Sequence, residues 1–249
     1  MAKLDGILKI QGTLENLTFY KSADGHMVRT KGGVSKNRIM NDPAFIRTRE
    51  NGTEFAENAS AGKILRNAVG SLVFKAKDPK LSSRMFKVMS VVKNYDGHSS
   101  RGKRNVAAGI QSVEGKSALK GFDFNNRALF ESVFHGLYNV DTTSGKIAIT
   151  DLIPTEQLHY PMSATHFSMR SAFANLDFSN AVSDITYSDV VNQKINNDLL
   201  SVVLVPTGVP AGSGTQLYLI LIEFFQEING VQYVLNNGAY NCLNILDVV

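Results

Sequence analysis

The chain has 249 residues, of which 43% are hydrophobic and 19% are charged. This composition is typical of globular proteins and excludes fibrous and intrinsically disordered classes. Its single cysteine, Cys242, cannot form an internal disulfide, so the fold does not depend on an oxidising compartment. Because Cys242 lies in an apolar run, we expect a small buried side chain there rather than a reactive thiol.

Charge is distributed unevenly along the chain. Residues 1–105 carry 20 Lys and Arg against 9 Asp and Glu, a net charge of +11. Residues 106–249 carry 6 Lys and Arg against 13 Asp and Glu, a net charge of −7. A split of this size indicates a basic region that binds nucleic acid, or two surfaces of opposite sign that meet within or between molecules.

Neither a signal peptide nor a membrane-spanning segment is predicted. Lys3, Asp5 and Lys9 interrupt the first ten residues, which therefore lack the apolar stretch of a signal peptide. The longest apolar run, 217–225, contains Glu223 and is far shorter than the roughly 20 residues of a membrane helix. We expect synthesis in the cytoplasm, and we leave open a final location in a virion or an extracellular assembly.

The first 41 residues are predicted to form a basic β-hairpin arm. Strands are expected over 6–10, 17–21 and 26–31, and the pair Asp24-Gly25 suits a tight turn between the last two. Residues 33–41 are expected to be a polar connector. A small hairpin is marginally stable alone in water, so this one is expected to pack against something else.

Residues 42–105 are predicted to be a helical segment. Asp42-Pro43 and Asp78-Pro79 are helix-start signals, since Asp caps free backbone N–H groups and Pro is tolerated at the first helical position. They predict helices over 43–74 and 79–95, with a break or kink at Asn51-Gly52. Residues 97–105, with the sequence GHSSRGKRN, are expected to form a basic loop.

Residues 106–249 are predicted to form a mainly antiparallel β-sandwich. Short runs with alternating apolar residues predict eight strands, over 129–138, 146–152, 166–176, 183–190, 199–205, 216–226, 231–235 and 240–248. The clearest hairpin joins 216–226 to 231–235 around Asn229-Gly230. The predicted fold class is therefore α+β: a hairpin arm, two helices and a β-sandwich.

The sequence contains no motif that indicates catalysis or a cofactor. It has no phosphate-binding P-loop and no G-x-S-x-G turn of a serine hydrolase. The spacing of its five histidines fits no common zinc pattern. We therefore predict a protein that is not an enzyme, with no catalytic residue, metal or cofactor.

Three segments together resemble a known group of proteins. They read GILKIQGTLENLTFYKSADGHMVRTKGGV, NDPAFIRTRENGTEF and FFQEINGVQYVLNNGAYNCLNIL. This pattern is similar to that of uncharacterised proteins of Bacteroidetes bacteria and their mobile elements, over roughly the first 70 and last 35 residues. The resemblance implies a basic N-terminal arm and helix followed by a C-terminal β domain, and it implies no activity.

Two functions from different classes fit these features. The first is a structural subunit that assembles with copies of itself, as a filament, a virion component or another particle, by docking the arm on a neighbour. The predicted interface comprises Leu17, Phe19, Lys21, Val28, Arg29 and Lys31. A monomer whose arm lies on its own acidic domain is explained by the same charges, so the sequence leaves both arrangements open.

The alternative is a nucleic-acid-binding protein. It rests on the net charge of the first 105 residues and on Arg101, Lys103 and Arg104, which would contact phosphates in the basic loop.

Overall fold

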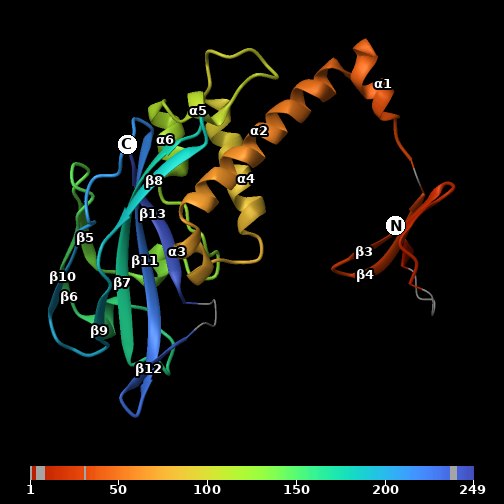
Figure 1. Cartoon of the computed structure of the whole chain (residues 1–249). Helices are drawn as coiled ribbons and strands as arrows, with labels where there is room; N and C mark the ends of the chain where they lie inside the picture. The colour runs from red at the N-terminus through yellow and green to blue at the C-terminus, as the bar shows by residue number, and fades with distance from the viewer. Residues whose placement is uncertain (1, 4–8, 31, 236–239) are drawn as a thin grey trace. The chain divides into compact units, whose positions relative to one another are not determined.

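The computed structural model describes residues 2–3, 9–30, 32–235 and 240–249 (Figure 1). They belong to two compact units, residues 1–50 and residues 51–249, which we call the arm and the body. Helices and antiparallel sheets combine in a mixed α+β fold whose body is rich in strands, as predicted. The predicted helical segment, 42–105, contributes to the same hydrophobic core as the strands that follow it.

The arm contains a small antiparallel sheet with the strand order β1-β4-β3-β2. Its strands are β1 (Ala2–Lys3), β2 (Gly12–Leu14), β3 (Leu17–Ser22) and β4 (Gly25–Thr30). The hairpin around Asp24-Gly25 is confirmed, and Gly25 has the positive φ, 109°, that the turn requires. Of the predicted strand 6–10, residues 6–8 lie outside the described residues, and residues 9–10 are in no strand.

The prediction of a connector over residues 33–41 is wrong for most of that stretch. Residues Lys36–Asn41 form a short helix, α1. Ser35 caps it, because the Ser35 hydroxyl accepts a hydrogen bond from the backbone N–H of Arg38 at 3.3 Å. The polar composition of the segment hid this capping signal.

The first predicted long helix is present but is divided at a different place. Asp42 accepts a hydrogen bond from the backbone N–H of Ala44 at 2.9 Å and starts a turn of 3-10 helix, Pro43–Phe45, which leads into α2 (Ile46–Ala68). No break occurs at Asn51-Gly52. The division falls at Val69, after which α3 (Gly70–Lys75) begins.

The second predicted helix is α4 (Leu81–Asn94), in which Met85, Met89 and Val92 are buried as their spacing indicates. Three short helices follow it: α5 (Val106–Gly109), α6 (Val113–Leu119) and α7 (Phe130–Val133). The predicted strand 129–138 is therefore wrong over its first half. A carboxyl oxygen of Asp123 accepts a hydrogen bond from the backbone N–H of Phe130 at 2.9 Å, which starts α7 there.

The remaining predicted strands are all present, and all strand pairs are antiparallel. A three-stranded sheet has the order β10-β6-β5, and a six-stranded sheet combines the path β12-β11-β7-β8 with β13 beside β11 and β9 beside β7. The elements are β5 (Leu137–Val140), β6 (Ile147–Leu152), α8 (Pro154–Gln157), β7 (His166–Asp177), β8 (Val182–Tyr187), β9 (Val191–Lys194), β10 (Leu200–Leu204), β11 (Thr215–Ile228), β12 (Val231–Val234) and β13 (Cys242–Val248). Strand β9 was not predicted.

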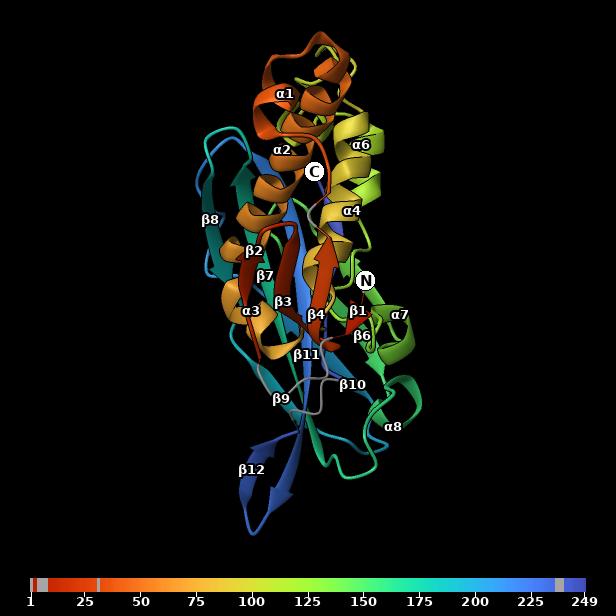
Figure 2. The same ribbon diagram turned by 90° about the vertical axis from the view of Figure 1, so that its right-hand side faces the viewer.

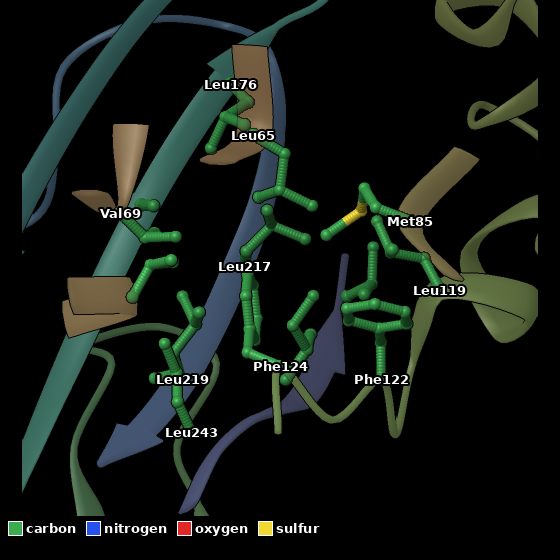
Figure 3. Close-up of a cluster of buried hydrophobic side chains, with 14 of the residues drawn as sticks. Leu65, Val69, Met85, Leu119, Phe122, Phe124, Leu176, Leu217, Leu219 and Leu243 are labelled. Carbon is green, nitrogen blue, oxygen red and sulfur yellow. The ribbon is translucent and has the colours of Figure 1, made fainter. Parts of the chain in front are cut away.

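The body has three layers, with the six-stranded sheet in the middle (Figure 1). One hydrophobic cluster fills the space between this sheet and helices α2, α4 and α6. Figure 3 shows that cluster, in which Leu65 and Met85 from the helices meet Leu217 from β11. A second cluster lies between the six-stranded and three-stranded sheets and contains the buried thiol of Cys242.

Strand β11 serves both clusters because its side chains point alternately to the two faces of the sheet. Leu217, Leu219 and Leu221 contribute to the helix-side cluster, whereas Ile220, Ile222 and Phe224 contribute to the cluster between the sheets. Its partner β7 is divided in the same way. The apolar run at 217–225 is therefore a central strand covered on both sides.

Two glycine substitutions are predicted to change the stability of the body in opposite directions. A Cβ added at Gly109, in α5, would overlap the carbonyl group of Val92 in α4, whereas one added at Gly52 would meet no atom. We predict that Gly109→Ala destabilises the fold by about 1–3 kcal/mol, the cost of overpacking a tight contact. Gly52→Ala, in the exposed part of α2, is predicted to stabilise it by about 0.5–1 kcal/mol.

The measurement is the urea midpoint of unfolding, followed by circular dichroism, for both variants beside the unmodified chain. Equal midpoints for the Gly109 variant and the unmodified chain would contradict the close approach of α5 to α4.

Candidate functional site

The arm sheet presents an apolar band on one of its two faces. In antiparallel sheets, residues directly opposite each other point to the same side. Phe19 lies opposite Val28, and Leu17 lies opposite Leu14 on the next strand. We call Leu14, Leu17, Phe19 and Val28 the apolar arm face. Four of the six residues predicted for assembly lie on this side: Leu17, Phe19, Val28 and, at one end, Lys21.

The other two predicted assembly residues do not belong to this face. Arg29 lies opposite Thr18 and therefore points to the other side of the sheet. There its guanidinium carbon lies 5.5 Å from the centre of the Tyr20 ring, a cation–π arrangement. Lys31 lies outside the described residues.

The described part of the arm has no core of its own. None of its described side chains is buried, and on the apolar arm face Leu14 is 65% exposed and Leu17 is 43% exposed. The side chains of Phe19 and Val28 are half-buried. Since a small sheet without a covered face gains little hydrophobic stabilisation, this face is the first candidate functional surface.

A second candidate is the basic loop, residues 97–105. Its Arg104 is already bound to a carboxylate inside the body. Its Nε and Nη2 atoms donate to the two carboxyl oxygens of Glu54 at 2.9 and 3.0 Å. Glu54 is buried in α2, where it also forms an ion pair with buried Lys93 and accepts the backbone N–H of Gly102 at 2.8 Å. These donors, Arg104 first, lower the pKa of Glu54 to about 2.

The same loop is held at a second point by Asp96. Its carboxylate accepts three backbone N–H groups, from His98, Ser99 and Asn105, at 3.0–3.1 Å. Arg101 donates to the side chain of Asn51 at 3.2 Å, and Lys103 is exposed. Arg101, Lys103 and Arg104 therefore lie in one loop, which Glu54 and Asp96 hold in place. We call these contacts the loop anchor, and the Arg104 guanidinium is part of it.

Charge differs between the arm and the body, and also within the body. The arm carries 9 Lys and Arg against 5 Asp and Glu, a net charge of +4. The body carries 17 of each sign, but its residues 51–105 have a net charge of +7 and its residues 106–249 have −7. The helix-bearing part of the body is therefore basic and the strand-bearing part is acidic.

A third candidate is a cavity of about 630 Å³ beside α7, which the sequence did not indicate. Asp123, Glu131, His135 and Asn244 line it. Burial raises the pKa of Asp123, whose Oδ1 accepts hydrogen bonds from Asn244 Nδ2 at 2.8 Å and from the backbone N–H of Phe130. Asp123 thus joins β13 to the start of α7, which is a structural role.

The described residues hold neither a group of metal-ligating side chains nor a membrane-spanning helix. Within the described part of the chain, no three His, Cys, Asp or Glu side chains are grouped so that they could hold a metal ion. No helix of that part is long and apolar enough to cross a membrane. Comparisons with protein families, with curated proteins and with solved structures found no match.

The buried carboxylate of Glu54 provides a test of the loop anchor. We predict that Glu54→Gln destabilises the body by about 3–5 kcal/mol, because it leaves the charges of Lys93 and Arg104 without their buried partner. Glu57→Gln, one helical turn later on α2, is the matched control and should change stability by less than about 0.5 kcal/mol. Urea denaturation at neutral pH measures both variants.

The same pair of variants has a pH signature. The pKa of Glu54 is lowered on folding, so its stabilising effect is complete above its ordinary pKa of 4.5 and is lost as the pH falls toward about 2. Stability should therefore fall less steeply over this range in the Glu54→Gln variant than in the Glu57→Gln variant. Identical pH profiles would show that the ion pair does not anchor the loop.

Proposed function

We propose that this chain is a non-enzymatic structural subunit that assembles with copies of itself through the arm. The observation that carries the proposal is the apolar arm face, which belongs to a sheet without a buried side chain among its described residues. Such a face requires a cover to be stable, and a neighbouring copy that docks on it would supply one. Head-to-tail contacts of this kind produce rings or filaments.

The apolar residues of the arm should set the affinity of this contact. Fully burying one side chain such as Leu17, Phe19 or Val28 contributes about 1.5–3 kcal/mol, whereas an exposed ion pair contributes roughly 0–1 kcal/mol. Lys21 and Arg29 should therefore mainly steer association and orient the partners. Their natural counterpart is the acidic strand-bearing part of a neighbouring body, with its net charge of −7.

Nucleic-acid binding is a second candidate, favoured by the net charge of +7 on residues 51–105 and by the exposure of Lys103. The commitment of Arg104 to Glu54 weakens it, because a guanidinium bound bidentately to a buried carboxylate has fewer donors left for phosphate. Self-assembly through the arm therefore ranks first.

Two substitutions on one strand test the arm contact. Phe19 and Tyr20 are adjacent aromatic residues of β3, both half-buried, and they lie on opposite faces of the arm sheet. We predict that Phe19→Ala weakens assembly at least tenfold, because losing an aromatic contact of about 1.4 kcal/mol or more changes an equilibrium constant by that factor. Tyr20→Ala should have a smaller effect. Analytical ultracentrifugation over a concentration series measures both.

Deletion of residues 1–33 complements these variants and should leave a folded body that no longer forms the arm-dependent assembly. The proposal fails if the full and shortened chains are both monomers at high concentration, or if both form the same assembly. In the first case the arm would serve its own chain, and in the second another surface would connect the copies.

A gel-shift assay tests the second candidate. If residues 97–105 bind nucleic acid, the shift at low salt should disappear as salt increases, because phosphate contacts release counterions. The double variant Arg101→Ala, Lys103→Ala should weaken the shift, whereas the control Lys63→Ala, at an exposed basic residue of α2 outside the loop, should leave most of it. No shift at low salt with micromolar protein would remove this candidate.

A further inference from the structure

The hairpin of β11 and β12 extends beyond the other strands of the six-stranded sheet in both views (Figures 1 and 2). Its turn is Asn229-Gly230, where both residues have positive φ, 52° and 79°, as tight hairpin turns require. All four residues of β12 are exposed, with Val231, Tyr233 and Val234 at 52–55%. Strand β12 has no charged residue, although edge strands are commonly protected by charges.

The outer edge of β12 differs from that of β13 and from the end of β8. The outer edge of β13 is covered, since its backbone bonds to the segment 121–124 through Gly121 and Phe124. The end of β8 is bonded through Tyr187 to the backbone of Thr207. Within the described ranges, no backbone group bonds to the side of β12 that faces away from β11.

The backbone groups that point outward from β12 can be identified. The N–H of Leu235 donates to the carbonyl of Phe224 at 2.9 Å, so residue 235 directs its backbone groups toward β11. Alternate residues of a strand direct these groups to opposite sides. The backbone groups of Val231 and Tyr233 therefore point toward β11. Those of Gln232 and Val234 point away from it, and no backbone group of the described residues bonds to them.

We propose that β12 pairs antiparallel with the β12 of a second copy, around a two-fold axis that passes beside Tyr233. An antiparallel pair forms its hydrogen bonds between residues that both point outward. The register with the most such bonds places Gln232 opposite the partner's Val234 and Val234 opposite the partner's Gln232. Tyr233 then faces the partner's Tyr233 in a non-hydrogen-bonded pair, where side chains come closest.

A second copy fits this edge because the edge is complementary to itself. Around a two-fold axis each residue meets its own kind or a near neighbour, so a charge on β12 would lie close to the same charge of the partner, and β12 has none. The pairing joins two marginal hairpins into a four-stranded sheet and covers exposed apolar side chains. It uses no arm residue and does not depend on the proposed function.

A cysteine placed at the two-fold axis gives a direct test in the full chain. Facing residues of a non-hydrogen-bonded pair have Cα atoms about 4.5 Å apart, within the range that a disulfide spans. Tyr233→Cys should therefore form a covalent dimer under mild oxidation, seen on a non-reducing gel. Gln232→Cys is the matched control, because its cysteine faces Val234 of the partner and should remain unlinked. The native Cys242 is buried and does not interfere.

Sedimentation provides an independent measurement that does not require oxidation. Tyr233→Lys places two ammonium groups face to face and should weaken the two-fold contact at least tenfold, without affecting the fold of the exposed hairpin. The proposal is overturned if Tyr233→Cys stays monomeric under oxidation, if both cysteine variants crosslink equally, or if Tyr233→Lys leaves the association unchanged.

Discussion

The body depends on one requirement, which is that β7 and β11 must be covered on both faces. Nearly every side chain is buried over the stretch in which these two strands pair, 166–176 with 215–225. A strand that is apolar on both sides needs a layer on each. The helices provide one layer and the three-stranded sheet provides the other. Glu223 is an exception within the buried part of β11, and its carboxylate is neutralised by Lys75 at 2.9 Å, at the end of α3.

The buried ion pairs of the helical layer follow from the same requirement. Helix α2 has to lie on the sheet along its second half, which brings Glu54 beneath the loop that follows α4. A buried carboxylate is costly unless it is paired and hydrogen-bonded, and Lys93, Arg104 and the backbone of Gly102 together meet that condition. The loop is therefore shaped by a charge inside the body, and its outward basic character is secondary.

The sequence predicted an element well where turn residues or apolar spacing within that element determine its structure. The hairpins at Asp24-Gly25 and Asn229-Gly230 follow from turn chemistry, and α4 follows from its apolar spacing. The strand expected over 129–138 is wrong over its first half, where α7 begins and the backbone N–H of Phe130 donates to Asp123, outside that stretch. Helix α1 was missed because its capping residue, Ser35, lies in an otherwise polar segment. In both cases the start of the helix has a hydrogen bond that the apolar pattern does not reveal.

The candidate surfaces were less predictable, because each depends on which residues meet. The side of the arm on which Leu17, Phe19 and Val28 lie follows from strand alternation, so the apolar arm face could be anticipated. The partner of Arg104 could not, since Glu54 lies 50 residues earlier in the chain. The contact of Asp123 with Asn244 spans 121 residues and has no sequence signal.

The position of β13 has a consequence for how the protein is made. Leu243 and Ile245 complete the same cluster to which helices α2 and α4 contribute, although β13 is synthesised about 150 residues after α4. Chains leave the ribosome at about 5–20 residues per second, so for several seconds the apolar side of these helices has no sheet to cover it. The body can close only after β13 has emerged. Until then the uncovered apolar side of the helices is the kind of surface through which incomplete chains aggregate.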